Sequence, residues 1–559
     1  MSAPQAIDRF DPQHTTLVSL LAEKTASEPD RPALQFKQGE QWTSWTWGQL
    51  AACVASMART LRQQYGVQPQ DRVAQVAENS PQWIVLDLAV LSLGAIHVPM
   101  HATLAGYQFQ QQIDDCRPRL VVLSGEHQWE KLRATEVPRR YPLASHSPCP
   151  EPVKSLASQE PTVSPEEALE FLQQAAGEVE PQDLATILYT SGTTGEPKGV
   201  MLSHGNLASN ALATVQVFEH HPGDVRLCWL PLSHIFARTC DLYTWVVSPG
   251  VELALAQSRD TLVADMAEVR PTLMNGVPYF FEKVMREVKD HPEVLPQVFG
   301  GRLRACCSGG AALPEHVARF YLQHGICLIQ GYGLTETSPV ATVCLDPQRA
   351  PSAGKPVPGT EIKIAEDGEI LIRGPLVMKG YWNRPQATAE AIRDGWFHTG
   401  DVGHLDPEGY LFITGRKKEI IVTSAGKNVA PALIEGLLTQ DPLIEQAIVI
   451  GDDRPFLVAL IVVEPKRLQQ ELQARGIDAP WPECLQDPRV QELYRRRIDG
   501  HLSGLSPHEQ VGQFALLHEP FTIQREELTP TLKLRRKVIQ EHYAEVIEEL
   551  YRRRRTTPA

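Results

Sequence analysis

The chain contains 559 residues, of which 42% are apolar and 21% are charged, and it carries a formal net charge of −14. This length exceeds what one hydrophobic core supports, so at least two domains are expected. The near-average composition argues against a disordered or fibrous protein. The acidic charge argues against a nucleic-acid partner, because phosphate binding requires a concentrated basic surface.

The ten cysteines are scattered, with one adjacent pair at Cys306 and Cys307 and no Cys-x-x-Cys spacing. This pattern indicates free thiols rather than a zinc site or a disulfide framework. The first residues, MSAPQAIDRFDPQHTT, are polar and lack the charged segment followed by an apolar one that a secretion signal requires. Both features favour a cytoplasmic location.

From Asp71 the sequence DRVAQVAENSPQWIVLDLAVLSLGAIHVPM alternates strand, turn, helix and strand, and the β-rich run LVVLSG follows. That order predicts βαβ units and therefore a parallel sheet. The apolar part, Trp83 to Met100, includes Asp87 and His97, so it is read as a buried helix running into a strand rather than as a membrane span. The Pro-, Ser- and Glu-rich segment between Pro138 and Pro181 is expected to be a surface connection with one short helix at its end.

Further along, EIKIAEDGEILIRGPLVMKGYW alternates apolar and polar residues, which predicts an antiparallel addition to the sheet system. The sequence changes character after Arg416, where a strand (EIIVTS), a helix (PALIEGLLTQ), further strands (QAIVIGDDRPFLVALIVVEP) and a polar, Arg-rich helical stretch follow in order. We therefore expect an α/β fold with a large domain at 1–416 and a small α+β domain at 417–559.

The chain closes with an expected amphipathic helix that places Ile539, Tyr543, Val546 and Leu550 on one face. The run Arg552–Arg555 lies at the C-terminal end of this helix, where the helix dipole favours cations. A solvated helix end is therefore preferred over a membrane-surface role for these arginines.

The strongest single motif is ILYTSGTTGEPKGVMLSHGN, in which a strand at 186–189 leads into a loop of small and hydroxyl residues. Such a loop exposes backbone N–H groups to an anion, and Lys198 adds a positive charge for phosphate. Two residues separate Gly195 from Lys198, so the spacing is not that of a Walker A loop. The expected phosphate-binding residues of the loop are Thr190, Ser191, Gly192, Thr193, Thr194, Gly195 and Lys198.

The segment TSGTTGEPKGVMLSH resembles the phosphate loop of the acyl-adenylate-forming (AMP-binding) superfamily, which includes acyl-CoA synthetases, luciferases and nonribosomal adenylation domains. Three further blocks appear in family order: GYGLTETSP at 331–339, DGWFHTGDVGHLDPEGYLFITGRKKEIIV at 394–422 and LTPTLKLRRKVI at 528–539. The chain is identified as a member of this superfamily. The resemblance implies a large N-terminal domain of packed, mostly parallel sheets with helices and a small β-barrel-like part, followed by a small mobile C-terminal α+β domain.

The resemblance implies a two-step reaction that uses ATP, Mg²⁺ and CoA. A carboxylate attacks the α-phosphorus of ATP to give an acyl-adenylate and pyrophosphate, and the acyl group then passes to a thiol. Two anions approach each other in the first step, so positive charge must be placed around them in advance. By resemblance, Glu336 and the Thr190 hydroxyl contact the magnesium ion through hard oxygen ligands, and Thr335 contacts the phosphate. Lys198 belongs to the same expected catalytic set.

The nucleotide base and sugar also have expected contacts by resemblance. Tyr332, next to Gly333, resembles the aromatic residue that stacks on adenine. The segment SGGAAL at 308–313, with Gly310 and Ala311, resembles the other side of that pocket. Asp401 in HTGD resembles the carboxylate that holds both ribose hydroxyls, and Arg416 in TGRKK is expected to be a second nucleotide contact.

Lys533 in TPTLKLRRK resembles the C-terminal lysine that bridges the substrate carboxylate and the phosphate during adenylation. It is preferred to its basic neighbours because the family pattern places the lysine before a hydrophobic residue and a basic pair. By resemblance, Lys418 is the hinge, and rotation brings TSAGKN, with Gly426, towards the pantetheine path. His234 in PLSHIFAR resembles a catalytic residue at the junction of the acyl and thiol pockets.

The segments PFLVALIVVEP and EELTPTLKLRRKVIQEHYAEVIEELY resemble bacterial long-chain fatty acid:CoA ligases, so a long-chain fatty acid is the expected substrate. Tyr279, Ala425 and a short insertion after Lys283 depart from the subfamily pattern. The alternatives are a medium-chain or aryl acid:CoA ligase, an acyl-adenylate ligase that loads a carrier protein, and a catalytically silent acyl-binding protein. A transient contact with the inner face of a membrane would suit a greasy substrate, but no segment demands it, and the oligomeric state stays open.

Overall fold

The computed structural model describes residues 14–132, 140–142, 161–191, 197–529 and 534–553. The chain divides into two compact units. The first unit comprises Met1–Ala365, Ile370–Thr399 and Leu405–Phe412, and the second comprises Glu366–Glu369, Gly400–His404 and Ile413–Ala559. The two units do not divide at one point of the chain, because short segments before Arg416 are grouped with the second unit. The domain boundary predicted after Arg416 therefore remains a prediction.

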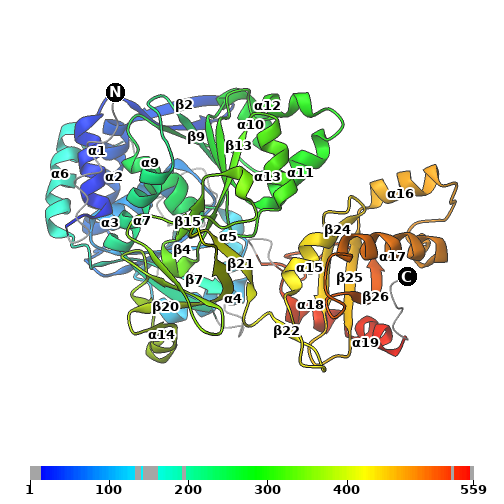
Figure 1. The fold of residues 1–559 in the computed structure, drawn as a ribbon. Helices are drawn as coiled ribbons and strands as arrows, with labels where there is room; N and C mark the ends of the chain where they lie inside the picture. Colours follow the sequence, from blue (N-terminus) through cyan, green and yellow to red (C-terminus); the bar gives the residue numbers. More distant parts are fainter. Residues whose placement is uncertain (1–13, 133–139, 143–160, 192–196, 530–533, 554–559) are drawn as a thin grey trace. The chain divides into compact units, whose positions relative to one another are not determined.

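A nine-stranded sheet forms one layer of the first unit (Figure 1). Six neighbouring strands, from β13 to β1 in the sheet order, are parallel, and β14, β15 and β2 are antiparallel additions at the edges. In sheet order the strands are β15 (Lys355–Pro356), β14 (Thr342–Cys344), β13 (Cys327–Tyr332), β12 (Ala305–Ser308), β11 (Leu273–Gly276), β9 (Val225–Cys228), β10 (Glu252–Leu255), β1 (Pro32–Gln38) and β2 (Gln41–Thr46).

A seven-stranded sheet carries the predicted βαβ segment. The apolar run is confirmed as a helix, Pro81–Ser92, followed by the strand Ile96–Met100, and that strand pairs parallel with β3. In sheet order the strands are β18 (Gly380–Tyr381), β8 (Pro197–Ser203), β7 (Leu184–Ser191), β4 (Ile96–Met100), β3 (Arg72–Val76), β5 (Leu120–Leu123) and β6 (Arg140–Pro142). The strand β6 was not predicted, and it lies in the segment expected to be a surface connection.

The charged residues of the apolar run are buried in pairs. Asp87 contacts Arg238 and accepts a hydrogen bond of 3.0 Å from the Tyr243 hydroxyl, while Nδ1 of His97 lies 2.8 Å from the same carboxylate. Burial alone would raise the pKa of Asp87, but the charge of Arg238 and the hydrogen bond to His97 hold it below its ordinary value. Asp87 can therefore be buried in an apolar helix because its ion-pair and hydrogen-bond partners are buried with it.

The helices of the first unit begin at recognisable caps. Ser80 accepts a hydrogen bond from the Trp83 N–H, with Pro81 in the first turn, and Thr46, Ser164 and Ser203 form capping boxes. The helices α1, α2 and α6 lie side by side (Figure 1). The helices are α1 (Leu17–Ser27), α2 (Trp47–Gln63), α3 (Pro81–Ser92), α4 (Gly106–Cys116), α5 (Glu126–Leu132), α6 (Pro165–Glu178), α7 (His204–Val217), α8 (Ile235–Ala237), η2 (Arg238–Tyr243), α9 (Thr244–Val247), α10 (Leu262–Val269), α11 (Pro278–Val288), η3 (Pro292–Val294), α12 (Leu295–Val298), α13 (Glu315–Gln323), η4 (Thr335–Thr337), η5 (Pro347–Arg349) and α14 (Pro385–Ala391).

The alternating segment at 361–382 forms the predicted antiparallel pair, because β16 (Glu361–Ile364) pairs with β17 (Glu369–Arg373). These strands belong to a five-stranded sheet with β20 (Trp396–Leu405), β19 (Ile392–Arg393) and β21 (Leu411–Arg416). The sheet is open: among the described residues, β16 and β19 are its two ends and do not pair with each other. The expected β-barrel-like part is therefore not a closed barrel.

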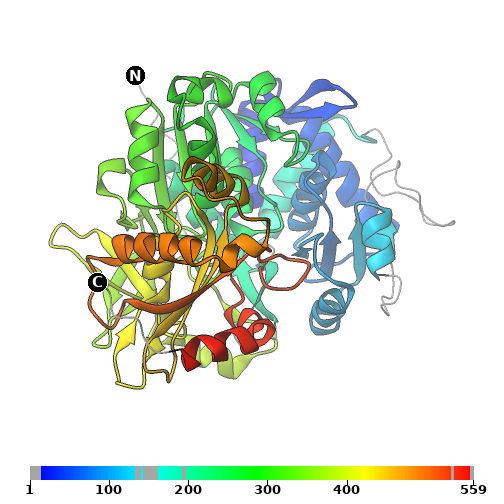
Figure 2. The same ribbon diagram turned by 90° about the vertical axis from the view of Figure 1, so that its right-hand side faces the viewer.

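The second unit contains a three-stranded sheet of β24 (Ile444–Ile450), β25 (Leu457–Val463) and β26 (Val511–Leu517). All seven residues of β25 are buried, because helices cover both faces of this sheet (Figures 1 and 2). The helices α15 (Pro431–Leu438), α16 (Pro465–Ala474), η6 (Glu483–Gln486) and α17 (Pro488–Leu502) pack with one face, and α18 (Arg536–His542) and α19 (Ala544–Arg552) pack with the other. A short hairpin, β22 (Ile421–Val422) and β23 (Asn428–Val429), precedes α15.

The prediction of one closing helix is wrong. The chain forms two helices, α18 and α19, that meet at Tyr543, whose backbone leaves the helical region at φ −108° and ψ 20°. The cause is tertiary: the Tyr543 hydroxyl accepts a hydrogen bond of 3.1 Å from Arg525, and its ring packs edge-on against Phe521. Ile539 and Leu550 are buried as predicted, and Ile547 joins them in the core.

In the part of the chain that the structure describes, no helix combines the length and the apolar character needed to cross a bilayer. The described cysteines carry free thiols, and most of them are buried.

Candidate active site

Four parallel neighbours in the nine-stranded sheet, β9, β11, β12 and β13, direct their carboxyl ends to the same edge. In open α/β sheets, ligands bind at this edge. The motif residues that follow β9, β12 and β13 are therefore neighbours: a Cβ added to Gly309, after β12, would lie 2.7 Å from the Phe236 ring, after β9. Asn79, after β3, also reaches this edge, where its side chain bonds to the Leu230 carbonyl at 2.7 Å and to the Leu232 N–H at 2.8 Å.

The loop GYGLTETSP is fixed by helices on its buried side. The Asn210 amide of α7 donates to the Val340 carbonyl at 2.7 Å, and the Thr239 hydroxyl donates to the Ser338 carbonyl at 2.8 Å. Gly333 is required by a close backbone approach, because a Cβ there would lie 1.6 Å from the Pro339 carbonyl oxygen. The one-turn helix η4, with Thr335 and Glu336, is therefore presented from a rigid base.

The structure brings Lys198 and Glu336 together through Tyr381. The Tyr381 hydroxyl donates a hydrogen bond of 2.8 Å to Oε1 of Glu336, and Nζ of Lys198 lies 5.0 Å from the centre of the Tyr381 ring. The three residues come from η4, β8 and β18, which are far apart in the sequence. The sequence motifs do not mark Tyr381, and the alternating strand pattern around it carries no signal of this contact.

The expected phosphate loop follows β7 and precedes β8, and these two strands pair antiparallel. Thr190 pairs with Lys198 across this hairpin, and its hydroxyl lies 3.5 Å from the Lys198 carbonyl oxygen. Ser191 ends β7. The remaining expected phosphate contacts, Gly192, Thr193, Thr194 and Gly195, lie outside the described residues.

The expected adenine pocket is built from the ends of two paired strands. β12 and β13 run parallel with Ser308 opposite Gln330, so SGGAAL and Tyr332 follow at the same edge of the sheet. The Gln330 side chain accepts a hydrogen bond of 3.0 Å from the Leu313 N–H, which fixes the loop to β13. Gly310, at φ +84°, and Ala311 form its exposed tip, and an exposed glycine loop next to an aromatic residue suits a flat base.

His234 is half-buried and caps the short helix α8, where its Nδ1 accepts a hydrogen bond of 3.2 Å from the Phe236 N–H. Its ring centre lies 6.2 Å from that of His101, and Nδ1 of His101 is 2.9 Å from the Ser233 hydroxyl. Burial and the charge of Arg259 lower the pKa of His101 to about 4, so this second imidazole is neutral at physiological pH.

In the second unit, Asp401 and Arg416 lie together. The Arg416 Nε is 3.1 Å from Oδ1 of Asp401, and the aspartate side chain is 12% exposed, whereas the arginine reaches solvent. The strands β20 and β21 carry these residues and pair with each other. A two-oxygen acceptor next to a cation suits a pair of hydroxyl groups, because each carboxylate oxygen can accept a hydrogen bond.

Sequence reasoning missed Glu369, which contacts the residues next to Asp401 and Arg416 in the chain. Its carboxylate accepts a hydrogen bond of 2.9 Å from the Gly400 N–H and lies 2.8 Å from Nζ of Lys417, which also contacts Asp367 at 2.5 Å. Burial alone would lower the pKa of Lys417, but the hydrogen bonds to Asp367 and Glu369 outweigh it and raise that pKa. The sequence carries no signal of this contact, because Glu369 reads as a polar position of an alternating strand.

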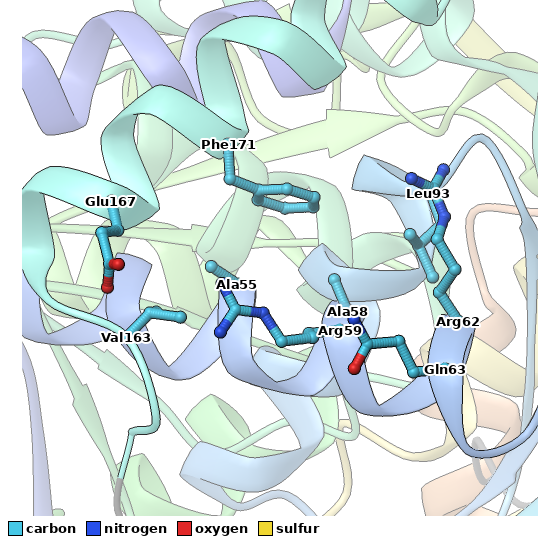
Figure 3. A pocket seen from close by; sticks show the side chains of 9 residues that line it. All are labelled: Ala55, Ala58, Arg59, Arg62, Gln63, Leu93, Val163, Glu167 and Phe171. Atoms are coloured by element: carbon cyan, nitrogen blue, oxygen red, sulfur yellow. The ribbon is translucent and has the colours of Figure 1, made fainter.

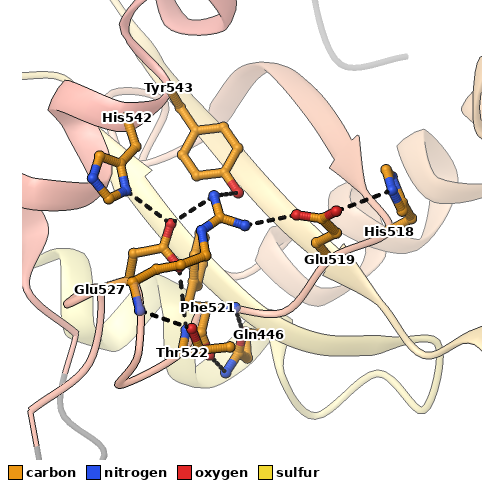
Figure 4. Close-up of polar contacts among 9 residues, drawn as sticks. Gln446, His518, Glu519, Phe521, Thr522, Glu527, His542 and Tyr543 are labelled. Carbon is orange, nitrogen blue, oxygen red and sulfur yellow. Dashed lines mark hydrogen bonds and ion pairs between the residues drawn. The ribbon is translucent and has the colours of Figure 1, made fainter.

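Lys533 lies outside the described residues, but the chain on both sides of it is held. Leu528 and Leu534 form a β-bridge, and the Arg535 N–H donates to the Glu527 carbonyl at 2.8 Å. Figure 4 shows the polar cluster around the Glu527 carboxylate, which contacts Arg525 at 3.0 Å and His542 at 3.1 Å.

The basic neighbours of Lys533 have different surroundings. Arg535 lies 3.2 Å from Glu526, and Arg536 pairs with Glu435, so both guanidinium groups are engaged within the second unit. Lys537 is exposed on α18.

Lys418 and Gly426 occupy turns. Lys418 is exposed in the turn between β21 and β22. Gly426, at φ +70°, lies between β22 and β23, and its N–H donates to the Thr423 carbonyl at 2.8 Å. The backbone conformation of Gly426 is one that side chains disfavour.

A pocket of about 160 Å³ lies between α2 and α6, away from the motif residues (Figure 3). The apolar side chains of Ala55 and Ala58 on one helix and of Phe171 on the other line it, together with Arg59 and Arg62. Of the expected site residues that the structure describes, none lines it.

Comparison with known proteins agrees with this geometry. Residues 21–382 match the family described as AMP-binding enzyme, and residues 418–555 match the AMP-binding enzyme C-terminal domain. The chain is 32% identical to the long-chain-fatty-acid–CoA ligase FadD15 of Mycobacterium bovis, over 96% of this chain and 97% of that protein. It is 29% identical to the long-chain-fatty-acid–CoA ligase ACSBG1 of Mus musculus, over 93% of this chain and 83% of that protein.

Solved structures share the fold. The anthranilate CoA ligase AuaEII in complex with anthranoyl-AMP has a TM-score of 0.78 at 20% identity, covering 97% of this chain and 100% of that one. ATP-bound MatB from Rhodopseudomonas palustris has a TM-score of 0.73 at 25% identity, covering 95% and 100%. Since the family match spans more than half of the sequence and the likeness to FadD15 spans nearly all of it, the chain belongs to the AMP-binding enzyme family.

Proposed function

We propose that this protein is an ATP-dependent, AMP-forming acid:CoA ligase whose substrate is a long-chain fatty acid. The observation that carries the proposal is the contact of Lys198 and Glu336 with one side chain, Tyr381. It places the lysine expected to bind phosphate beside the carboxylate expected to bind magnesium. A cation site and a phosphate site that share one neighbouring side chain suit a metal–nucleotide complex.

The residues present suit ATP and Mg²⁺. Magnesium keeps several waters and is bound through one or two carboxylates together with the phosphates of its substrate. Among the described residues no group of three His, Cys, Asp or Glu side chains gathers to hold a metal by itself. The single carboxylate of Glu336, with the Thr190 hydroxyl, fits an ion that arrives with the nucleotide. When bound, the ion neutralises charge on the phosphates.

The chain's own residues then have defined roles. Lys198 holds a phosphate, Thr335 and the N–H groups of the phosphate loop complete that site, and Tyr332 stacks on the base. Asp401, oriented by Arg416, accepts hydrogen bonds from the ribose. Lys533 supplies a positive charge between the carboxylate and the phosphate during adenylation.

Rotation of the domain at 417–559 about Lys418 separates the two half-reactions. One lysine cannot serve both steps if the thiol enters where the lysine stood, so the small domain exchanges Lys533 for the turn that contains Gly426. The engagement of Arg535 and Arg536 within the second unit supports Lys533 as the residue that reaches the substrate. His234, whose ring centre lies 6.2 Å from that of His101, is proposed to act at the junction of the acyl and thiol pockets.

The acid is proposed to be long-chain because FadD15 and ACSBG1 carry that name. AuaEII carries the name of an anthranilate CoA ligase, so a medium-chain or aryl acid is the second candidate. A carrier-protein acceptor and a catalytically silent acyl-binding protein are the remaining alternatives. A transient membrane contact is a further prediction, which co-sedimentation with anionic lipid vesicles would test.

The deciding experiment measures acid-dependent conversion of ATP to AMP and pyrophosphate with acetate, octanoate, palmitate, oleate and benzoate, with and without CoA. Preference for palmitate or oleate, formation of acyl-CoA and loss of adenylation in Lys533→Ala would support the proposal. Adenylation without transfer to CoA would favour a carrier protein. No turnover with any acid would favour the silent acyl-binding protein.

A further inference from the structure

Tyr381 is a buried residue whose two ends meet two different site residues. Its hydroxyl donates a hydrogen bond of 2.8 Å to Oε1 of Glu336, and its ring lies 5.0 Å from Nζ of Lys198. The residue is only 9% exposed. A buried tyrosine hydroxyl needs a partner, and here the partner is a carboxylate with its own expected role.

The backbone of Tyr381 is held on several sides. In β18 it pairs antiparallel with Val200 of β8. Its N–H donates to the Thr388 hydroxyl at 2.8 Å, and its carbonyl accepts from the Arg384 N–H at 3.1 Å. A Cβ at the preceding Gly380, which adopts φ +139°, would lie 2.5 Å from Thr388, so this close packing depends on a glycine. The ring is therefore held in place by the fold.

Glu336 is also fixed through its backbone, because its carbonyl accepts a hydrogen bond of 2.9 Å from the Met378 N–H. Met378 lies three residues before Tyr381, so one stretch of chain holds both the backbone and the carboxylate of this glutamate. The hydrogen bond from Tyr381 engages Oε1 and leaves Oε2 as the oxygen available to a further partner.

We propose that Tyr381 is a positioning residue for the metal–nucleotide complex. Its hydroxyl orients the Glu336 carboxylate so that Oε2 meets a hydrated divalent cation carried by ATP. Its ring holds the Lys198 ammonium beside that carboxylate through a cation–π contact. A carboxylate already held in one orientation loses less freedom on binding than a rotating one. This inference rests on the proposed ligase function.

The two contacts of Tyr381 can be separated by substitution, with ATP binding measured by calorimetry in the presence and absence of Mg²⁺. Tyr381→Phe keeps the ring and removes the hydroxyl. Metal-free ATP should then bind as it does to the wild type, and Mg·ATP binding should weaken by roughly tenfold, as expected for a lost hydrogen bond to a charged group. Tyr381→Leu also removes the ring, so metal-free ATP should bind several-fold more weakly as well, because Lys198 loses its cation–π partner.

Tyr321→Phe is the matched control. The buried Tyr321 hydroxyl donates a hydrogen bond of 2.9 Å to the Phe281 carbonyl in a separate core cluster. Its loss should lower the melting temperature and leave both ATP affinities unchanged. The inference is overturned if Tyr381→Phe binds Mg·ATP like the wild type, or if it loses affinity for both ATP forms equally. A wild-type protein that binds no ATP would count against the proposed function instead.

Discussion

Glu527, which precedes Lys533 by six residues in the sequence, lies at the centre of a polar cluster (Figure 4). Its side chain is fully buried, its Oε1 contacts Arg525 and His542, and its Oε2 accepts a hydrogen bond of 3.2 Å from the Thr522 N–H. Glu527→Gln keeps the shape of the side chain and removes its charge. The substitution should loosen the chain around Lys533 and leave the core of the second unit in place.

The size of the effect follows from what the substitution leaves behind. Removing one partner of a fully buried ion pair costs about 3–5 kcal/mol, because the other charge stays buried and unpaired. Here Arg525 and His542 are 38% and 39% exposed, so water can solvate both of them. The loss should therefore be close to one hydrogen bond to a charged group, about 2 kcal/mol. That free energy corresponds to a roughly 30-fold change in the population of molecules in which the contacts of Glu527 hold.

Single-turnover kinetics of the two half-reactions would measure this change. Glu527→Gln should slow acyl-adenylate formation by up to about 30-fold, because Lys533 is proposed to act in that step. Transfer of the acyl group from preformed acyl-adenylate to CoA should stay close to the wild-type rate. Hydrogen exchange should become faster in the backbone between Thr522 and Arg535 and stay unchanged in β25.

Glu519→Gln is the matched control, because Glu519 contacts the same arginine at 2.7 Å but is 62% exposed. Exposed ion pairs contribute at most about 1 kcal/mol, so both half-reactions should stay near the wild-type rates. An unchanged adenylation rate in Glu527→Gln despite faster exchange would refute the reasoning, and so would equal losses in both half-reactions. A Lys533→Ala variant that still adenylates would refute the role of Lys533 itself.

Three further substitutions test other parts of the molecule. Lys418→Pro should slow acyl transfer to CoA more than adenylation in single-turnover assays, because proline restricts the proposed hinge; equal losses would contradict the hinge. Asp401→Asn should weaken AMP binding roughly tenfold in calorimetry, as expected for lost charged hydrogen bonds, whereas exposed Asp394→Asn should not. Burial lowers the pKa of His204 from 6.5 to about 4. As the pH drops from 6.5 to 4, the His204 imidazole is therefore protonated in the unfolded chain but not in the folded one, and the free energy of unfolding falls. His204→Gln should flatten that fall by up to about 1.4 kcal/mol per pH unit in denaturant titrations, and exposed His508→Gln should leave it unchanged.

Local sequence patterns were enough to predict helices and strands whose ends are marked by residues within the same segment. The helix at Pro81–Ser92 and the strand after it follow from an apolar run that begins at a serine cap with a proline in the first turn. The closing helix shows the limit of such patterns. Its periodicity continues through Tyr543, but contacts with Arg525 and Phe521, distant in the sequence, end the helix there. Tertiary contacts overrode the local preference.

The same limit applies to the candidate site. Motifs predicted the residue types expected to bind phosphate, metal and ribose. The structure joins Lys198 and Glu336 through Tyr381 and brings Asp401 close to Arg416. Tyr381 and Glu369 could not be predicted, because each acts on residues brought near only by strand pairing. In the sequence, Glu369 reads as a polar position of an alternating strand. Only the sheet shows that its carboxylate is turned to Gly400 and Lys417.

The contacts of Lys417 restrict where a rotation of the small domain can begin. Its side chain is bound to Asp367 and Glu369, and its N–H donates to the Gly400 carbonyl at 2.8 Å. Residue 417 is therefore tied to strand β20, whereas the next residue, Lys418, is exposed in a turn. A rotation about Lys418 would leave Asp401 and Arg416 together, because both precede the hinge on paired strands. The proposed ribose contact would then persist through both half-reactions, while the turn that contains Gly426 replaces Lys533.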